Sequence, residues 1–428
     1  MADFDAIVVG SGLAGAVAAH ELARAGKGVL VVERGNQAGS KNVSGGRLYT
    51  HSLAAVFPGY ASEAPLERRI THERIGFLAP DAGFTVDFTS DGLRAEGRDS
   101  YSVLRAPFDQ WLASQAEDAG AEYICGIPVE DLLMEGSRVT GIVAGEDEIT
   151  ADAVLLCDGV NSLLTRKAVG YAGPTPEATA VGIKEVIKLD PQVIEDRLLV
   201  PEGEGAAWLF AGDATHGVPG GGFVYTNKES LSIGLVVPIA DLLTGETPIY
   251  QLLDDFKRHQ VVAPLIKGGE VIEHSGHMVP EGGWDAMPKL VGDGVLVAGD
   301  AAMMCLNLAY TVRGMDYAIA AGMHAGRAAA EALTAGDTSA AGLQGYVKAL
   351  ENSFVLQDLR QFRKVPHFIS GTKRIFDTYP AVIRDFFEKL FIVDSNPTAP
   401  VRKAGFAAAK QAGLLNLARD MKGALSSL

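Results

Sequence analysis

Short apolar runs that end in glycine divide the amino-terminal part of the chain into regular elements. Residues 6–9 (Ala-Ile-Val-Val) and 29–32 (Val-Leu-Val-Val) are continuous apolar runs of the kind that form buried parallel strands. An alanine-rich segment that ends at Gly26 lies between them and is long enough for one helix. This order predicts a strand, a helix and a second strand over residues 5–35.

The turn between the first strand and the helix carries glycines at fixed spacing, and an acidic residue follows the second strand. Gly10 permits a tight turn, Gly12 lets the backbone approach a pyrophosphate, and Gly15 lets the helix pack on the strand. The phosphates would lie at the helix amino terminus, which favours anions. Glu33 is placed to accept hydrogen bonds from an adenosine ribose and would repel a 2′-phosphate, so the pattern predicts a dinucleotide other than NADP.

The same lobe is completed by segments that come much later in the chain. The apolar spacing over residues 107–119 predicts a helix, and residues 138–157 have the pattern of a hairpin whose second strand is buried. An apolar run at 294–298 predicts another strand of this lobe, followed by Gly299-Asp300 and a helix that runs to about Leu333.

A second lobe is expected between these segments. Residues 181–187 and 231–237 alternate in the manner of antiparallel strands. Residues 342–428 are mostly helical in pattern. No low-complexity linker separates the parts, so we expect interleaved lobes rather than domains that follow one another along the chain.

Composition narrows the function classes. Of the 428 residues 47% are hydrophobic and 21% are charged, which is typical of a globular protein. The formal net charge of −16 argues against nucleic acid as a partner, because phosphate binding needs clustered lysine and arginine. No run approaches the ~18–20 apolar residues of a membrane-spanning helix. The first residues lead directly into a strand without a signal-peptide core, so the expected location is cytoplasmic.

The cysteine content excludes two kinds of site. Cys125, Cys157 and Cys305 lie far apart and show no C-x-x-C spacing, so a disulfide framework is not expected. Three cysteines cannot supply the four thiolates of an iron–sulfur cluster from this chain alone. No metal site is predicted.

Two further motifs follow buried strands. Asp158-Gly159 ends the strand at 153–156, and Gly299-Asp300 ends the strand at 294–298. Residues at the carboxyl ends of strands are where ligands cross such a sheet, and Asp300 is suited to accept hydrogen bonds from ribityl or ribose hydroxyls. An aspartate at a strand end also suits a plain turn or a helix cap. Together with the glycine turn, in this order, the two motifs predict a flavin site with FAD as cofactor.

This trio resembles the glutathione-reductase-like FAD proteins of the aromatic-hydroxylase and geranylgeranyl-reductase group. Arg105 with the following Phe108-Asp109-Gln110-Trp111-Leu112 is similar to a segment of that group whose arginine contacts the flavin chain. The resemblance further implies that a strand residue near Val129 contacts the adenine, and that Gly314-Met315 lies at the edge of the isoalloxazine ring.

A closer resemblance, over nearly the whole chain, is to the FixC branch of the electron-transfer-flavoprotein:quinone oxidoreductase family. It rests on four segments, which are Lys41–Tyr49, Gly182–Glu185, Gly221–Asn227 and Val312–Asp316. It implies that electrons arrive from FixA/FixB-like electron transfer flavoprotein subunits and leave to a quinone, in a FixABCX-type electron-bifurcating complex. It also implies a ferredoxin-like FixX subunit that carries the iron–sulfur cluster, and a peripheral location at the cytoplasmic face of the membrane.

The residues expected to contact FAD come from all of these motifs. In the small-residue loop, backbone N–H groups of Ser44, Gly45 and Gly46 would stabilise a reduced, anionic flavin. The full set is Gly10, Ser11, Gly12, Leu13, Ala14, Gly15, Glu33, Arg34, Lys41, Asn42, Ser44, Gly45, Gly46, Arg105, Val129, Asp158, Gly159, Gly299, Asp300, Gly314 and Met315. No catalytic residue is assigned, although quinone reduction needs protons. The possible proton donors are His274, His277, Asp316 and Tyr317.

The expected fold class is α/β. A glutathione-reductase-like FAD-binding Rossmann domain (1–60, 101–171 and 291–335) is interleaved with an antiparallel-sheet quinone or substrate domain (61–100 and 172–290), and a helical region (336–428) follows for membrane or partner contact. Within that region, residues 380–394 have the spacing of a short amphipathic helix that either packs on the core or contacts a membrane. The segment from Phe362 to Phe376 is the other possible membrane contact.

Departures from the wider group speak against a hydroxylase. Arg166 lies four residues after Ser162 rather than three, and Leu306-Asn307-Leu308 stands where a proline is expected. Two alternatives to quinone reduction stay open. One is a prenyl reductase of the geranylgeranyl-reductase type, and the other is a flavin-containing assembly subunit without a substrate of its own.

Overall fold

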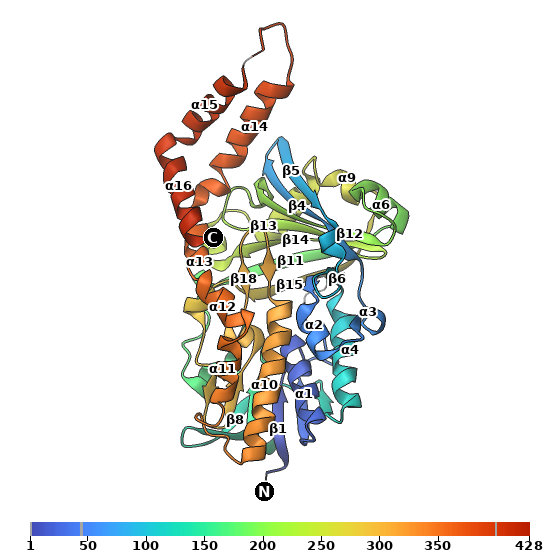
Figure 1. The fold of residues 1–428 in the computed structure, drawn as a ribbon, viewed down its shortest axis with the longest axis vertical. Helices are drawn as coiled ribbons and strands as arrows, with labels where there is room; N and C mark the ends of the chain where they lie inside the picture. Colours follow the sequence, from blue (N-terminus) through green and yellow to red (C-terminus); the bar gives the residue numbers. More distant parts are fainter. Residues whose placement is uncertain (1, 43–45, 399) are drawn as a thin grey trace.

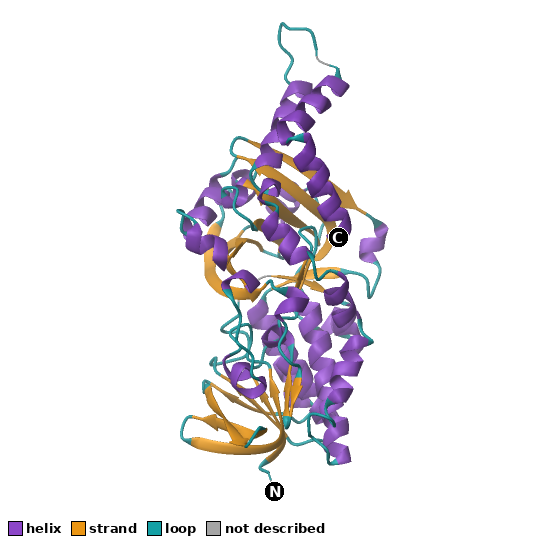
Figure 2. Ribbon diagram, turned by 90° about the vertical axis from the view of Figure 1, so that its left-hand side faces the viewer, coloured by secondary structure: helices purple, strands orange, loops and turns teal. Residues whose placement is uncertain are grey.

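Two lobes, each built around a sheet, lie one above the other, and helices from the end of the chain run along both (Figure 1). The structure is a computed structural model, which describes residues 2–42, 46–398 and 400–428. The first lobe holds the amino terminus, and the second lobe lies above it in Figure 1. The carboxyl-terminal helices extend beyond the second lobe in both views (Figure 2).

The centre of the first sheet is parallel, in the order β17-β10-β1-β2-β7. Val8 of β1 lies in register with Val31 of β2 and with Leu155 of β10, and these side chains are buried. Strands buried on both faces need continuous apolar sequence, which explains the runs that predicted them. The strands are β1 (Phe4–Val9), β2 (Val29–Glu33), β7 (Glu122–Cys125), β10 (Asp147–Leu156) and β17 (Val295–Val297), with β8 (Val129–Glu135), β9 (Arg138–Ala144) and β16 (Val291–Gly292) at the edges.

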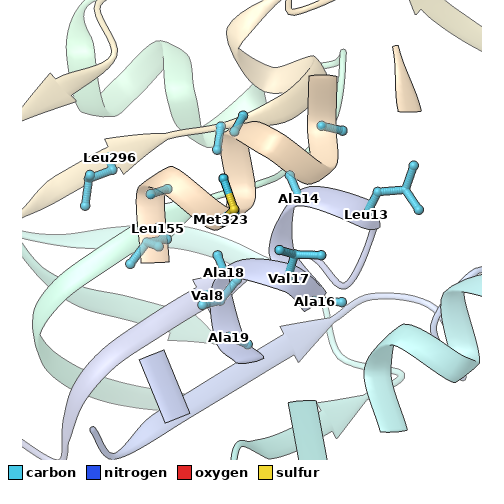
Figure 3. Packing of buried hydrophobic residues seen from close by; sticks show 14 of the residues in the cluster. Val8, Leu13, Ala14, Ala16, Val17, Ala18, Ala19, Leu155, Leu296 and Met323 are labelled. Atoms are coloured by element: carbon cyan, nitrogen blue, oxygen red, sulfur yellow. The ribbon is translucent and has the colours of Figure 1, made fainter. Parts of the chain in front are cut away.

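Two helices that are far apart in the sequence pack closely over this sheet. They are α1 (Leu13–Arg24) and α10 (Met315–Ala335). A Cβ atom on Gly322 would lie 2.2 Å from the carbonyl oxygen of Ala14, and one on Gly326 would lie 2.6 Å from that of Ala18. Figure 3 shows the small side chains of α1 between the sheet and α10. The close approach therefore depends on glycine in α10.

The second sheet contains β15-β11-β14-β13-β12-β4-β6-β3 in this order, with β5 paired to β4. Its strands are β3 (Gly46–Tyr49), β4 (Arg69–Ala79), β5 (Ala82–Thr89), β6 (Ser100–Val103), β11 (Thr179–Lys188), β12 (Glu204–Gly212), β13 (Gly221–Thr226), β14 (Ser230–Pro238) and β15 (Glu270–Pro280). The predicted strands over 181–187 and 231–237 are confirmed as an antiparallel pair, with Ile183 opposite Leu235. Strands β3 and β6 also belong here.

One face of the second sheet carries its own apolar core. Ile183, Leu235 and Phe256 are buried together on the side covered by helices. These helices are α6 (Pro191–Leu198), α8 (Ile249–Arg258) and α9 (Ala263–Ile266), with α7 (Ile239–Thr244) at the end of β14. The opposite face lies toward the first lobe (Figure 1).

The structure confirms the α/β fold class, with a Rossmann lobe, an interleaved sheet lobe and a helical end. The domain bounds given above stay a prediction. The expectation that a long helix directly follows Gly299-Asp300 is wrong. A short 3-10 helix (η5, Gly299–Ala302) and a hairpin (β18, Leu306–Asn307; β19, Val312–Arg313) come first, and α10 begins only at Met315.

The helical end of the chain has two parts. Helices α11 (Gln344–Glu351), α12 (Phe354–Gln361) and α13 (Val365–Gly371) run up from the first lobe, and α14 (Thr378–Phe391), α15 (Val401–Ala412) and α16 (Leu414–Ser427) form the projecting part (Figure 1). The amphipathic helix predicted for 380–394 is α14, which ends at Phe391. Its Phe387 stacks on Phe84 of β5 with ring centroids 4.9 Å apart. One face of α14 therefore packs on the second sheet.

The contact between α1 and α10 yields a stability prediction. Gly322→Ala would push a methyl group into the Ala14 carbonyl, because the backbone of α10 lies directly against the backbone of α1 at this point. We expect a loss of about 1–3 kcal/mol of unfolding free energy, the usual range for overpacking. Thermal unfolding followed by circular dichroism measures it. Gly405→Ala in α15 is the control, since open space surrounds that position and alanine favours the helix. Equal melting temperatures for the two variants would contradict this account.

Candidate functional site

The glycine turn of the first lobe has the geometry that a bound pyrophosphate needs. Gly10 has φ +93°, and a Cβ atom there would lie 2.5 Å from the Cys157 carbonyl oxygen. A Cβ atom on Gly15 would lie 1.9 Å from the Gly10 carbonyl oxygen. Gly12 instead has open space around it and precedes α1 without a side-chain cap. The first N–H groups of α1, at Leu13 and Ala14, are thus left to a phosphate.

The acidic residue after β2 is held at this turn. The Glu33 carboxylate accepts one hydrogen bond from the Ser11 N–H (2.8 Å) and one from the Gly35 N–H (2.6 Å). Each carboxylate oxygen keeps a lone pair for a ribose hydroxyl. The Ser11 hydroxyl is buried in this corner and interacts with the Tyr123 hydroxyl. Arg34 follows as an exposed cation.

The arginine at the start of α4 (Arg105–Asp118) is fixed by a buried partner. Arg105 donates to both oxygens of Asp109, at 2.8 and 2.9 Å. The Asn42 amide donates to the same carboxylate, which ties the loop after β2 to α4. Lys41 next to it is exposed. This arrangement holds Arg105 in one orientation.

Arg105 faces the third motif. Burial raises the pKa of the Asp300 carboxyl above its usual range, and the positive charges of Arg105 and His277 oppose this shift. Gly299, which precedes it, has φ +70°, and a Cβ atom there would lie 2.9 Å from the Ala14 side chain. The first and third motifs are therefore in direct contact, and Asp300 lies beside the arginine expected to contact the flavin chain.

The predicted ring-edge segment meets the small-residue loop. Gly314 caps α10, and the Met315 sulfur would lie 3.0 Å from a Cβ atom on Gly46. Ser44 and Gly45 lie outside the described residues. The structure thus brings together two segments more than 260 residues apart in sequence that were both expected to border the isoalloxazine ring.

Two predicted contacts have other partners in the structure. The Asp158 carboxylate accepts hydrogen bonds from the Leu164 N–H (3.0 Å) and the Thr165 hydroxyl (2.8 Å), so it caps α5 (Leu163–Val169). Gly159 forms the turn between them with φ +73°. Val129 is half-buried at the start of β8 and packs on the core of the first lobe. Their contacts with FAD stay predictions.

The possible proton donors fall in different places. His274 lies 3.4 Å from Glu185, which pairs with Lys257 of α8 on the helix-covered face of the second sheet. That face points away from the first lobe. His277 is close enough to Asp300 for the two charges to interact.

Asp316 and Tyr317 belong to a network that the sequence did not reveal. Asp316 accepts from Arg313 (2.6 Å) and lies 3.1 Å from His51 of α2 (His51–Val56), and Tyr317 donates to Asp358 of α12 at 2.9 Å. Arg313 also pairs with Asp358 at 2.7 Å. The sequence around His51 and Asp358 has no periodic pattern that would indicate a functional role. Arg313 could be suspected only because it precedes Gly314, which was expected to lie at the flavin ring.

Within the described ranges there is no cluster of three or more His, Cys, Asp or Glu residues arranged to hold a metal ion. In the same part of the chain, no helix combines the length and the apolar character that crossing a membrane requires.

Comparison with known proteins gives matches along the whole chain. Residues 3–213 match the model of an FAD binding domain, and residues 365–428 match the ETF-QO/FixC family C-terminal domain. The probable electron transfer flavoprotein-quinone oxidoreductase YdiS of Escherichia coli K12 is 48% identical over 98% of both chains, and Protein FixC of the same strain is 48% identical over 98% of both.

Among solved structures, a geranylgeranyl bacteriochlorophyll reductase-like protein from Thermoplasma acidophilum has a TM-score of 0.72 at 18% identity. The match covers 98% of this chain and 99% of the other. The flavin-dependent brominase Bmp2 has a TM-score of 0.64 at 16% identity, covering 95% and 98%. At these identities the likeness concerns the fold. With the domain match and the glycine turn, FAD is the cofactor of this chain.

The fixed orientation of Arg105 yields a binding prediction. Arg105→Met should weaken FAD binding about 10- to 100-fold, because hydrogen bonds to charged groups contribute about 1.5–3 kcal/mol. Flavin fluorescence titration of the apoprotein measures the Kd. Arg98→Met, at an exposed arginine, is the control. A Kd equal to that of the control would show that Arg105 does not contact the cofactor.

Proposed function

We propose that this chain, which belongs to the ETF-QO/FixC family, passes electrons from an electron transfer flavoprotein to a membrane quinone. It is an FAD-dependent oxidoreductase. The observation that carries the proposal is the 48% identity to YdiS over 98% of the chain, which includes both the flavin site and the helical end. The proposal also includes membership of a FixABCX-type bifurcating complex, with FixA/FixB-like and FixX-like partners. It further includes a peripheral position at the cytoplasmic face of the membrane.

The residues of the site have defined tasks in such a reaction. When bound, FAD supplies the redox chemistry, and the protein supplies position and electrostatics. The glycine turn would hold the pyrophosphate, and Glu33 would hold the ribose. Arg105, fixed by Asp109, would hold the flavin chain together with Asp300. Gly314 and Gly46 let backbone come close to the ring, since neither carries a side chain.

The projecting helices supply a surface suited to a membrane. Large apolar side chains are exposed where α14 ends and α15 begins, with Phe391 75%, Val393 83% and Phe406 64% exposed. This part of the chain extends beyond the second lobe (Figure 1). The other possible contact, from Phe362 to Phe376, is less suited, because Phe376 is 5% exposed and Phe362 packs on the first core. We therefore propose that the membrane contact is at the tip formed by residues 391–398 and 400–406.

Reoxidation of the reduced flavin tests the proposed acceptor. The purified protein with bound FAD is reduced without oxygen, a soluble quinone analogue is added, and flavin absorbance is followed. We expect rapid reoxidation, because quinone is the proposed electron acceptor. Reoxidation by an unsaturated isoprenoid but not by quinone would favour a prenyl reductase. No reoxidation by quinone, either alone or after co-purification with partner subunits, would contradict the proposal.

The tip has a separate test. Replacing Phe391 and Val393 together by aspartate should reduce binding to phosphatidylcholine–phosphatidylglycerol vesicles at least about 10-fold, since burying each apolar side chain contributes about 1.5–3 kcal/mol. Vesicle flotation measures the bound fraction. Leu199→Asp, at a side chain 77% exposed in the second lobe, is the control. Unchanged flotation of the double variant would place the membrane contact elsewhere.

A further inference from the structure

The face of the second sheet that lies toward the first lobe carries a buried lysine. On β11, Ile183 and Ile187 belong to the helix-covered core, and Glu185 between them pairs with Lys257 of α8 at 2.9 Å. Side chains alternate along a strand, so Lys184 is on the other face. Its side chain is 1% exposed. A lysine is rarely buried to this extent unless the surroundings compensate its charge.

The two strands that neighbour Lys184 place polar groups on one side of it and an aromatic ring on the other. Lys184 lies opposite Ser275 of β15, and His277 is two residues further on the same face. On the other side it lies opposite Gly234 of β14, where a Cβ atom would lie 2.6 Å from the ring of Phe223. An aromatic ring thus lies on one side of the lysine, and polar groups lie on the other.

This face is coupled to the flavin site by charge. Lys184 interacts electrostatically with Arg105 of α4 and with Glu273 of β15. Burial and the Arg105 charge lower the pKa of Lys184 to about 7, and Glu273 opposes the shift. His277, its neighbour on the sheet, interacts with Asp300. Both first-lobe partners, Arg105 and Asp300, are residues expected to contact FAD.

Ser275 adds a second observation. Its hydroxyl oxygen is buried and has no hydrogen-bond partner among the described residues. A buried hydroxyl without a partner is costly, so a ligand that accepts its hydrogen bond binds more tightly. An oxygen acceptor between Ser275 and Lys184 would receive hydrogen bonds from both.

We propose that Lys184 and Ser275 bind a carbonyl oxygen of the quinone and that Lys184 donates the proton which this oxygen takes up on reduction. The inference rests on the proposed quinone reduction. The quinone gains two electrons and two protons. The electrons and one proton come from the reduced flavin in its anionic form, and the other proton leaves the Lys184 ammonium as its N–H bond breaks and the O–H bond of the quinol forms. The neutral amine is then reprotonated from solvent.

The decisive experiment compares two electron acceptors. Lys184→Met with bound FAD is reduced, then reoxidised either by a quinone analogue or by ferricenium, which takes electrons without protons. We expect quinone reduction to slow about 100-fold or more, the usual contribution of a general acid, while ferricenium reduction is unchanged. Lys188→Met, at an exposed lysine on the same strand, is the control.

Two further measurements separate proton donation from a structural or purely electrostatic role. Lys184→Arg keeps the charge but does not release a proton, so quinone binding, measured by flavin fluorescence, should persist while reduction is slow. In the unchanged protein, the rate should fall as the pH rises above about 7, because the amine form cannot donate. Burial also raises the pKa of Glu281 to about 7, so Glu281 could cause a similar pH dependence. If the pH dependence disappears in Lys184→Met, it belongs to Lys184.

The outcomes are distinct. An equal loss with both acceptors, or a shifted flavin midpoint potential, would show that Lys184 acts on the flavin or on the fold, and an unchanged quinone rate would show no role. Each would overturn the inference while leaving the proposed function standing. A wild-type protein that quinone does not reoxidise would overturn both. If Lys184→Met loses FAD, then Lys184→Arg and Ser275→Ala provide the test, with weaker quinone binding expected for Ser275→Ala.

Discussion

The contact of α1 with α10 at Ala14 is the constraint on which the flavin site depends. The backbone of α10 reaches Ala14 because Gly322 has no side chain, and Gly299 of the third motif touches the same residue. Ala14 itself is in the first turn of α1, where the pyrophosphate is predicted to bind. One small residue therefore fixes the position of three segments that are up to about 300 residues apart in sequence. A larger side chain at any of these positions would push the three segments apart.

The second sheet is held to this centre through its edge. Strand β3 begins at Gly46 beside Met315, and Arg47 in the same strand pairs with Glu73 of β4, so the edge of the sheet is tied both to α10 and to its own interior. The chain crosses between the lobes several times, which leaves the sheet little freedom to pivot. A sheet fixed in this way can present side chains to the flavin from a constant distance, as positioned chemistry requires.

Sequence patterns predicted what local physics determines. Buried parallel strands need continuous apolar runs, so β1, β2 and β10 were recognisable, and the glycine turn with Glu33 follows from its spacing. The hairpin from Leu306 to Arg313 was not predicted, because two-residue strands have no detectable period. The partners of Asp158 and Asp316 were equally hidden. A carboxylate that caps α5 and one that pairs with Arg313 look alike in sequence, and only tertiary packing separates them.

The position of Lys184 could likewise not be predicted from the sequence, and the packing of the helices on the second sheet determines it. Alternation identified its strand, but not which face would be covered by helices and which by the first lobe. Once α8 occupies one face, every polar group on the other must find a partner inside the molecule, because a buried charge or hydroxyl without one is costly. Glu273 meets part of that need for Lys184 and Asp300 meets it for His277, and the Ser275 hydroxyl remains unsatisfied among the described residues. The face toward the first lobe therefore keeps a buried hydroxyl beside a buried cation, which is the arrangement that the proposed oxygen-bearing substrate would need.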